Sequence, residues 1–199
     1  MNLVLTMAGK YSRFKLLGSK IPKYLLPLST KTVLMEVIGQ YLLSYPTLRV
    51  YLIANRADQL FFPIVRSIIK SFESSNIEII YIDDTLSQVE TATCLTNFRN
   101  PPNLQESVSF ANIDTILINR KLFFKKLQKM SGIKIGFLDT FEGYSSQYSY
   151  CLVDEKNTVS HVAEKRVISD KACSGLYGFG TYETFITNAK ELMKKNRSA

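Results

Sequence analysis

The sequence predicts an α/β fold, a three-layer α/β/α sandwich around a mostly parallel, mixed sheet. The chain has 199 residues, about the length of one domain. Hydrophobic residues make up 46% of it and charged residues 21%, which is typical of a chain that buries a core. Short apolar runs alternate with helical patterns from the first residue on. That alternation is typical of parallel strands joined by right-handed helical crossovers.

The first part of the chain contains four apolar runs that end in polar or turn-forming residues. We expect buried strands there, at residues 2–8, 49–55, 77–82 and 107–114. Between them, residues 32–45 place Val33, Val37 and Tyr41 on one helical stripe, and Pro46 stops the pattern. Helices are therefore predicted at 32–45, 58–75 and 88–98.

The pattern changes after about residue 130. Short strand-like runs separated by polar turns precede a last helix at 181–195; they lie at 134–139, 148–154, 158–165 and 176–180. We expect these runs to add antiparallel or mixed strands to the same sheet and to form a lid or a substrate pocket. No linker or repeat interrupts the chain, so residues 1–199 are predicted to be one domain with two functional halves, 1–118 and 119–199.

The chain is basic, with 25 Lys and Arg against 17 Asp and Glu and a net charge of +8. That balance favours an anionic partner: nucleic acid, acidic lipid or a phosphorylated small molecule. The basic residues are scattered and no nucleic-acid recognition motif is present, so no nucleic acid is expected. No apolar run approaches the roughly 20 residues of a membrane helix, and no signal peptide is evident. Three cysteines at unrelated spacings add no metal pattern. We expect a cytoplasmic protein without a membrane partner.

The segment after the first predicted strand, residues 7–28 (the first loop), is suited to a polyphosphate. In open α/β sheets, ligands bind beyond the carboxyl ends of the strands. Backbone N–H groups and cationic side chains bind phosphate oxygens, and the first loop offers such groups at Ala8, Gly9, Ser12, Arg13 and Lys23. Taken alone, the same residues are also compatible with a basic surface turn.

Six stretches carry a family resemblance. MAGKYSRF (7–14), PKYLLPL (22–28) and TVLMEVI (32–38) resemble the start of the nucleotide-sugar pyrophosphorylases and related nucleotidyltransferases. Three later stretches resemble, in the same order, the base-reading, metal-binding and acceptor-binding segments of that family: SQVETA (87–92), FANIDTIL (110–117) and EKRVISDKACSGLYGF (164–179). The small capsular cytidylyltransferases of the CTP:phosphoglutamine type look nearest.

The resemblance implies a Rossmann-like, GT-A-like nucleotidyltransferase fold. It also implies Mg²⁺-dependent transfer of a nucleoside monophosphate from a nucleoside triphosphate, with CTP favoured, to a phosphorylated small molecule, with release of pyrophosphate. Phosphoglutamine, phosphocholine and sugar phosphates are the acceptors considered, in capsule or surface-polysaccharide biosynthesis. Residues 1–118 would then be the nucleotide-binding half and 119–199 the acceptor-binding half. The oligomeric state stays open.

The same resemblance implies roles for single residues. The nucleotide would contact Met7, Ala8, Gly9, Ser12, Arg13, Lys23, Gln88 and Thr91. Arg13 and Lys23 would be catalytic, since Arg13 would clamp the triphosphate and Lys23 would neutralise the α-phosphate. Asp114 would hold Mg²⁺. The acceptor would contact Asp114, Glu164, Lys165, Ser174 and Gly175.

Alternatives to these roles remain at the level of sequence. Asp114 is also compatible with a turn cap, Gln88 with an ordinary helix start, and Glu164 with Lys165 as an exposed charge pair. Tyr11 stands where the family loop has a glycine, so either the loop is reshaped or Tyr11 stacks on the nucleotide. The chain also lacks the family's later segment with a further carboxylate, which makes it C-terminally short and leaves a non-catalytic, nucleotide-binding relative as the alternative function.

Overall fold

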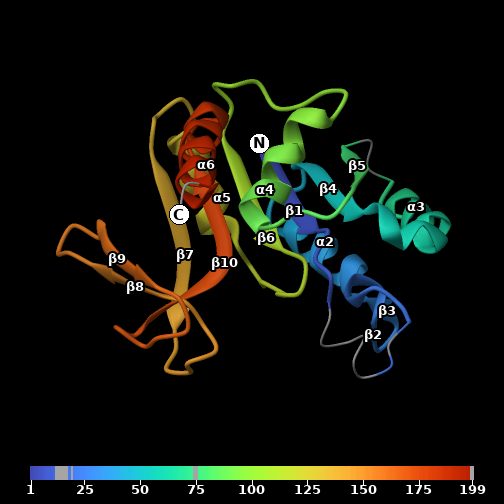
Figure 1. The fold of residues 1–199 in the computed structure, drawn as a ribbon, viewed down its shortest axis with the longest axis horizontal. Coiled ribbons are helices and arrows are strands. Elements are labelled where there is room, and N and C mark those ends of the chain that lie inside the picture. Colours follow the sequence, from blue (N-terminus) through green and yellow to red (C-terminus); the bar gives the residue numbers. More distant parts are fainter. Residues whose placement is uncertain (12–17, 19, 74–75, 198–199) are drawn as a thin grey trace.

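A computed structural model describes residues 1–11, 18, 20–73 and 76–197. An eight-stranded sheet lies at its centre (Figure 1). The strand order along the sheet is β5 (Ile77–Ile82), β4 (Arg49–Asn55), β1 (Asn2–Met7), β6 (Val108–Asn112), β10 (Lys171–Phe179), β8 (Tyr150–Val153) and β9 (Val159–Ala163), and β7 (Gly136–Glu142) also pairs with β10.

The sheet is mostly parallel, as the sequence predicts. Strands β5, β4, β1 and β6 all run in one direction, so Leu5 of β1 lies opposite Leu52 of β4 and Ala111 of β6. Strand β10 is antiparallel to β6, and the strands that follow residue 130 pair antiparallel with one another. The predicted addition of antiparallel strands to one mixed sheet is therefore confirmed.

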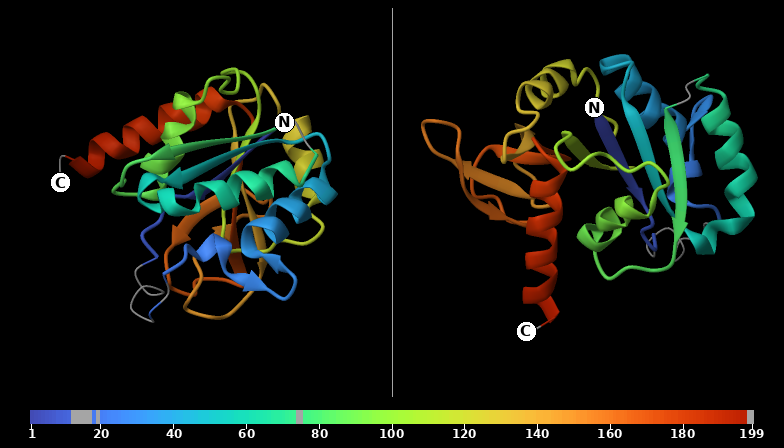
Figure 2. Two further views of the ribbon diagram at one scale, coloured as in Figure 1. Left: turned by 90° about the vertical axis from the view of Figure 1, so that its right-hand side faces the viewer. Right: turned by 90° about the horizontal axis from the view of Figure 1, so that it is seen from above.

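Strand β10 divides the sheet near its middle. Its pairing register shifts between Cys173 and Tyr177. After the shift β10 lies between β6 and β7, whereas before it β10 pairs with β7 and, at Ala172, with β8. As a result, the β8–β9 hairpin stands away from the parallel strands (Figures 1 and 2).

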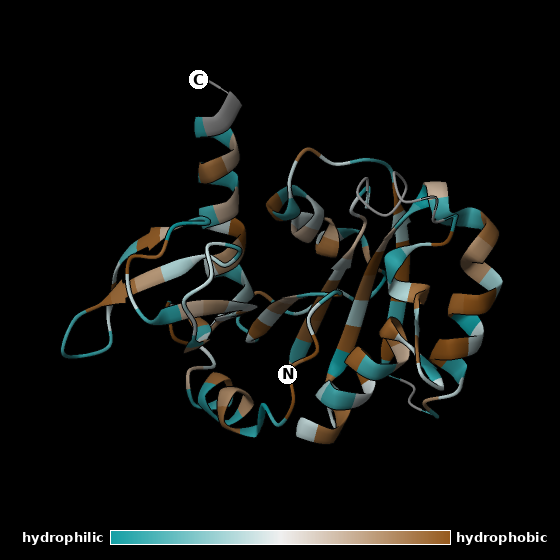
Figure 3. Cartoon of the chain, turned by 90° about the horizontal axis from the view of Figure 1, so that it is seen from below, coloured by the Kyte–Doolittle hydropathy of each residue, from teal (hydrophilic) through white to brown (hydrophobic). Residues whose placement is uncertain are grey.

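Helices cover both faces of the sheet and make the predicted three layers (Figure 2). Alternate residues of a strand point to opposite faces, and β1 follows that rule. Leu3 and Leu5 belong to a core cluster with α2 (Val33–Ser44), α3 (Phe62–Lys70) and α5 (Lys121–Lys129). Val4 belongs to a second cluster with α4 (Gln88–Thr93) and α6 (Tyr182–Arg197). Hydrophobic residues recur along the central strands (Figure 3).

The helices differ from prediction in three places. The helix predicted at 58–75 is divided into a 3₁₀ segment, η2 (Arg56–Phe61), and α3, and Pro63 sits in the first turn of α3, where its missing N–H costs nothing. The helix predicted at 88–98 continues after α4 as η3 (Cys94–Asn97). Helix α5 was not predicted; its buried residues Phe123, Phe124 and Leu127 lie within a lysine-rich sequence.

A small hairpin was also not predicted: β2 (Pro27–Leu28) pairs antiparallel with β3 (Lys31–Thr32) just before α2. Thr32 ends that hairpin and caps α2, since its side chain accepts a hydrogen bond from the backbone N–H of Met35. In the described part of the chain, no helix has the length and apolar character needed to cross a membrane.

Candidate functional site

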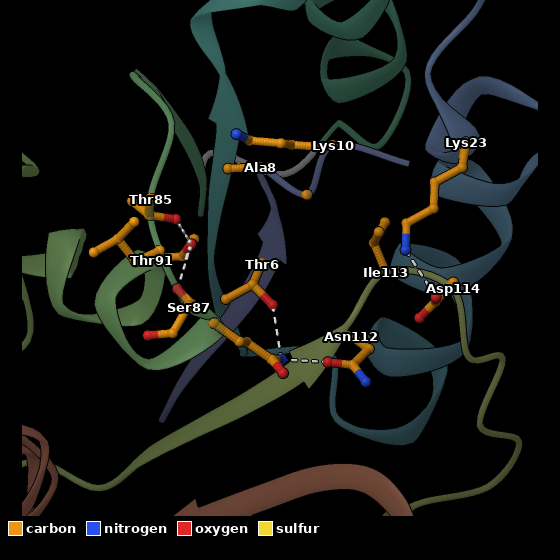
Figure 4. A pocket seen from close by; sticks show the side chains of 13 residues that line it. Thr6, Ala8, Lys10, Lys23, Thr85, Ser87, Thr91, Asn112, Ile113 and Asp114 are labelled. Carbon is orange, nitrogen blue, oxygen red and sulfur yellow. Dashed lines mark hydrogen bonds and ion pairs between the residues drawn. The ribbon is translucent and has the colours of Figure 1, made fainter. Parts of the chain in front are cut away.

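A cavity of about 560 Å³ opens at the carboxyl ends of β1 and β6 (Figure 4). We refer to it as the first cavity. Its walls come from the end of β1 and the first loop, from the start of α4, and from the segment after β6. The lining residues are Thr6, Ala8, Gly9, Lys10, Lys23, Thr85, Leu86, Ser87, Gln88, Thr91, Asn112, Ile113 and Asp114.

The first cavity brings together residues that the sequence analysis selected from distant segments. These are Ala8, Gly9, Lys23, Gln88, Thr91 and Asp114. Met7 is different, because it is completely buried in the core cluster with Leu5 and is not among the lining residues. Ser12 and Arg13 lie outside the described residues.

Opposite charges meet at one end of the first cavity. The Lys23 Nζ atom donates a hydrogen bond to Asp114 Oδ2 at 2.7 Å (Figure 4). Lys23 begins a single 3₁₀ turn, η1 (Lys23–Leu25), whose next residue, Tyr24, is fully buried. The turn places the Lys23 backbone and the ion pair with Asp114 holds the ammonium, so a phosphate entering here meets a cation beside a carboxylate.

Gln88 bridges two strands at the other side of the first cavity. Its Nε2 atom donates to Thr6 Oγ1 at 3.1 Å and to Asn112 Oδ1. An amide group has two N–H donors and one carbonyl acceptor, so both donors are engaged. In the described part of the chain, the Gln88 carbonyl oxygen makes no hydrogen bond, and it is the group that Gln88 offers to a ligand.

The segment before α4 is held by a cap. The Ser87 hydroxyl accepts a hydrogen bond from the Glu90 N–H at 3.1 Å, and a Glu90 side-chain oxygen accepts one from the Leu86 N–H at 2.6 Å. This arrangement is close to a capping box and satisfies backbone donors at the start of the helix. Thr91, one turn later, is buried and lies against Thr85 (Figure 4).

Tyr11 occupies the backbone conformation that favours glycine, with φ of +35°. Its hydroxyl donates to Asp58 Oδ1, and the Tyr24 hydroxyl donates to Asp58 Oδ2 at 2.9 Å. Asp58 is itself buried. Burial, reinforced by Asp58, raises the pKa of both tyrosines, so both stay protonated donors at neutral pH. Tyr11 does not line the first cavity.

A second cavity of about 510 Å³ adjoins the first, and Asn112 lines both. It lies where β10 departs from β6. Its lining residues are Asn112, Thr115, Leu117, Arg120, Phe141, Gln147, Tyr148, Ser149, Cys173, Ser174, Gly175 and Tyr177. The predicted acceptor residues Ser174 and Gly175 are therefore placed together. Gly175 has φ of +84°, and a Cβ atom there would lie 3.0 Å from Asn112 Nδ2.

Glu164 and Lys165 are placed differently. They follow β9, both side chains are mostly exposed, and they pair with each other at 3.4 Å. Neither residue lines the first or the second cavity. Their positions thus correspond to the exposed charge pair that the sequence left open as an alternative.

Asp114 is the side chain of the first cavity that is suited to a hard divalent cation. Among the described residues, no cluster of three or more His, Cys, Asp or Glu side chains is present. Asp114 is the one carboxylate of the first-cavity lining, and its side chain is about half exposed. Mg²⁺ commonly binds one or two carboxylates together with water and substrate phosphates. Asp114 therefore suits an ion that arrives with a phosphorylated ligand.

Seven lining residues were not selected from the sequence: Thr6, Lys10, Thr85, Leu86, Ser87, Asn112 and Ile113. Lys10 pairs with Asp84 at 3.0 Å, and Asp84 itself does not line the cavity. Asn112 carried a signal, because it lies in the predicted strand 107–114 two residues before Asp114 and so falls on the same side of the sheet. Lys10 lies inside the motif of the first loop and was passed over in favour of Arg13.

Solved structures with the same fold are nucleotide-sugar pyrophosphorylases and related transferases. The nucleoside-diphosphate-sugar pyrophosphorylase from Vibrio cholerae RC9 is 24% identical, with a TM-score of 0.80 over 97% of this chain and 78% of that one. A UDP-glucose pyrophosphorylase complexed with UDP-glucose is 16% identical, with a TM-score of 0.73 over 95% of this chain and 79% of that one. A candidate glucose-1-phosphate thymidylyltransferase from Bacillus anthracis, solved with a sucrose, is 12% identical, with a TM-score of 0.73 over 94% of this chain and 73% of that one.

No protein-family model matches the chain, and no curated protein matches it. The likeness to the three structures concerns the path of the chain, since at most 24% of residues are identical. It covers both the parallel half and the antiparallel strands around β10, because at least 94% of the chain is aligned. The chain has the nucleotidyltransferase fold of these structures.

Proposed function

We propose that the protein is a Mg²⁺-dependent nucleotidyltransferase. It would transfer a nucleoside monophosphate from a nucleoside triphosphate to a phosphorylated small molecule and release pyrophosphate. The observation that carries the proposal is the pair of Lys23 and Asp114, joined at 2.7 Å in a cavity at the carboxyl ends of the parallel strands. The fold shared with nucleotide-sugar pyrophosphorylases supports the same reaction class.

The reaction asks the protein mainly for positioning and charge neutralisation. An oxygen of the acceptor phosphate attacks the α-phosphorus, and pyrophosphate leaves with the electron pair of the broken P–O bond. Lys23 would neutralise the α-phosphate as negative charge develops there. Asp114 would hold Mg²⁺, which when bound supplies charge stabilisation to phosphate oxygens. Arg13 and Ser12, outside the described residues, are proposed to complete the triphosphate site.

The two cavities suggest where each substrate would bind. The first cavity would hold the nucleotide, with Ala8 and Gly9 beside the base and ribose, and the second would hold the body of the acceptor against Ser174 and Gly175. A role for Glu164 and Lys165 on the acceptor would require the segment after β9 to approach the second cavity. The donor base would meet the Gln88 carbonyl oxygen, which accepts from an N–H group.

We favour CTP as the donor and capsule or surface-polysaccharide precursors as the product class. The exocyclic amine of cytosine is an N–H donor that suits the Gln88 carbonyl. Phosphoglutamine, phosphocholine and sugar phosphates are the acceptors to compare. UTP, dTTP and GTP, whose bases also carry N–H groups, are the alternative donors.

A pyrophosphate-release assay tests the proposal. Four nucleoside triphosphates are crossed with the acceptor panel in the presence of Mg²⁺, and the best pair is then used for variants. Lys23→Ala and Asp114→Ala are each expected to lower kcat/KM by about 10²–10³-fold, because each removes a charge placed at the reacting phosphates. Lys31→Ala is the matched control, since Lys31 is exposed and pairs with Glu36 away from the cavity. Unchanged rates in the two cavity variants would reject these roles.

Tyr11 in the glycine position favours one further candidate, a nucleotide-binding relative without chemistry. That candidate predicts nucleotide binding in calorimetry with no pyrophosphate from any donor and acceptor pair. Pyrophosphate release from one pair, abolished in Asp114→Ala, would exclude it.

A further inference from the structure

The second cavity contains one fixed charge among its described lining residues, the guanidinium of Arg120. The other lining groups are aromatic, apolar or neutral and polar. Cys173 belongs with the neutral groups, because burial raises the pKa of its thiol to about 11. Among the described lining residues, a ligand therefore meets a single positive charge, and that charge is paired from behind with Asp139.

Arg120 is fixed from behind by residues that do not line the cavity. Its backbone N–H donates to Ser44 Oγ of α2 at 2.9 Å. Its Nε atom lies 3.3 Å from Asp139 Oδ2 of β7, and the two side chains are 27% and 16% exposed. In the described part of the chain, the terminal nitrogens of Arg120 make no hydrogen bond. Since a guanidinium has five donors, the contact with Asp139 leaves most of them for a ligand.

This arrangement is typical of anion recognition by arginine. The planar fork of a guanidinium matches the two oxygens of a carboxylate or a phosphate, and such bidentate contacts are stronger than neutral hydrogen bonds. A carboxylate behind the arginine fixes its orientation, so less conformational freedom is lost when a ligand binds. Asp139 is suited to that part, because it contacts Arg120 without lining the cavity.

The remaining walls suit a compact organic body. Phe141 and Tyr148 meet edge to face, with ring centroids 5.1 Å apart, and Tyr177 lines the same cavity. Gln147 and Ser149 add hydrogen-bonding groups. Because Asn112 borders both cavities, a molecule whose phosphate lies near Lys23 and Asp114 can extend into the second cavity.

We infer that Arg120 is a specificity residue that binds a second anionic group, a carboxylate or a second phosphate, on the phosphorylated acceptor. The inference rests on the proposed function, because it assigns the second cavity to the acceptor. It narrows the acceptor class to molecules with two acidic groups. Arg120 affects how tightly the acceptor binds, whereas Lys23 and Asp114 act at the reacting phosphate.

Calorimetry with matched pairs of compounds tests the inference without requiring turnover. Phosphoserine is compared with phosphoethanolamine, and glucuronic acid 1-phosphate with glucose 1-phosphate; both pairs differ by a carboxylate. Glucose 1,6-bisphosphate against glucose 1-phosphate tests a second phosphate. In at least one pair, the compound with the second anionic group is expected to bind the wild-type protein about tenfold or more tightly than its partner, the scale of a charged hydrogen bond.

Arg120→Gln is expected to abolish that preference while changing the binding of the partner compound by less than about threefold. The matched control is Lys121→Gln, which removes the same charge one residue later from an exposed position outside the cavity, and it should keep the preference. Arg120→Lys should keep only part of it, since an ammonium lacks the fork. A wild-type protein without preference in any pair, or a preference that survives in Arg120→Gln, would overturn the inference.

Removing Arg120 alone leaves Asp139 unpaired, so folding needs its own control. The double variant Arg120→Gln with Asp139→Asn removes both charges and is expected to unfold at a temperature close to the wild type, again without the preference. The pyrophosphate assay separates the two proposals. An Arg120-dependent preference without pyrophosphate release supports the binding site and rejects the transfer reaction. Pyrophosphate release without an Arg120-dependent preference would support the transfer reaction and reject the binding site.

Discussion

Asp58 connects the two ends of the first loop. One oxygen accepts from Tyr11 and the other from Tyr24, the residue next to Lys23, so a single buried carboxylate holds both sides of the segment proposed to bind phosphate. The resemblance indicated that position 11 is unusual, because a glycine was expected there. Its partner could not be inferred, because Asp58 is 47 positions away and its burial depends on the tertiary fold.

Replacing this carboxylate should destabilise the protein. Asp58→Asn exchanges one acceptor for an N–H group facing a tyrosine hydroxyl, and we expect a loss of about 1–3 kcal/mol in the free energy of unfolding, measured with denaturant. Asp83→Asn serves as a comparison, because Asp83 forms an exposed pair with Arg56, and it should change stability by less than about 0.5 kcal/mol. Equal effects in the two variants would argue against a special role for Asp58.

At the level of elements, apolar sequence patterns predicted the bounds of buried strands best. The strands at 49–55 and 77–82 have the bounds expected from the sequence. Helix α5 was missed because only three of its nine residues are buried and the rest is rich in lysine, which weakens the hydrophobic signal. The register shift in β10 was not predicted either, since it falls around Gly175, whose positive φ and neighbour Asn112 on a distant strand no local pattern reveals.

Two glycines in different elements should respond oppositely to alanine. At Gly39, within α2, a Cβ atom meets nothing within 4 Å, so Gly39→Ala should stabilise the protein by about 0.5–1 kcal/mol. Gly175→Ala places a Cβ at φ of +84° against Asn112, and we expect a loss of about 1–3 kcal/mol with weaker acceptor binding. Thermal unfolding of both variants checks the two signs. A stabilised Gly175→Ala would contradict the cost expected for a Cβ atom at this positive φ beside Asn112.

For the whole molecule, the layered fold followed from the alternation of strands and helices, but the division into two cavities did not. The second cavity depends on β7, β8 and β10 meeting at the register shift, and on Arg120, which sequence reasoning did not select. Neither the meeting of these strands nor the position of Arg120 can be predicted from a local sequence pattern, because both depend on contacts between segments far apart in the chain. The first cavity was more accessible, since its residues follow the carboxyl ends of strands.

Stability should fall in alkaline solution. Burial raises the pKa of Tyr51 from 10.0 to about 12 and that of Cys173 from 9.0 to about 11. Between these values the unfolded chain has lost protons that the folded protein keeps, so the free energy of unfolding decreases by about 1.4 kcal/mol per pH unit for each group. Below about pH 9, Tyr51 and Cys173 are protonated in both the folded and the unfolded protein, so they do not make the free energy of unfolding depend on pH.

Denaturant titrations from pH 7 to pH 12 measure this dependence. Tyr51→Phe should reduce the slope between pH 10 and pH 12, because that variant has no hydroxyl to titrate. A flat profile above pH 10 in the wild-type protein would contradict the raised pKa values.

The order of strands also determines when each cavity can exist as the chain is synthesised. The central strand β1 is made first, then β4 and β5 on one side of it, and then β6 on the other. All lining residues of the first cavity lie between Thr6 and Asp114, so all of them are synthesised before the second half emerges. The second cavity also needs Tyr177 of β10, which is synthesised later. Because a domain tends to fold as a unit, and the two core clusters also include Phe124, Leu176 and Phe185, neither cavity is expected to be complete until α6 has been made.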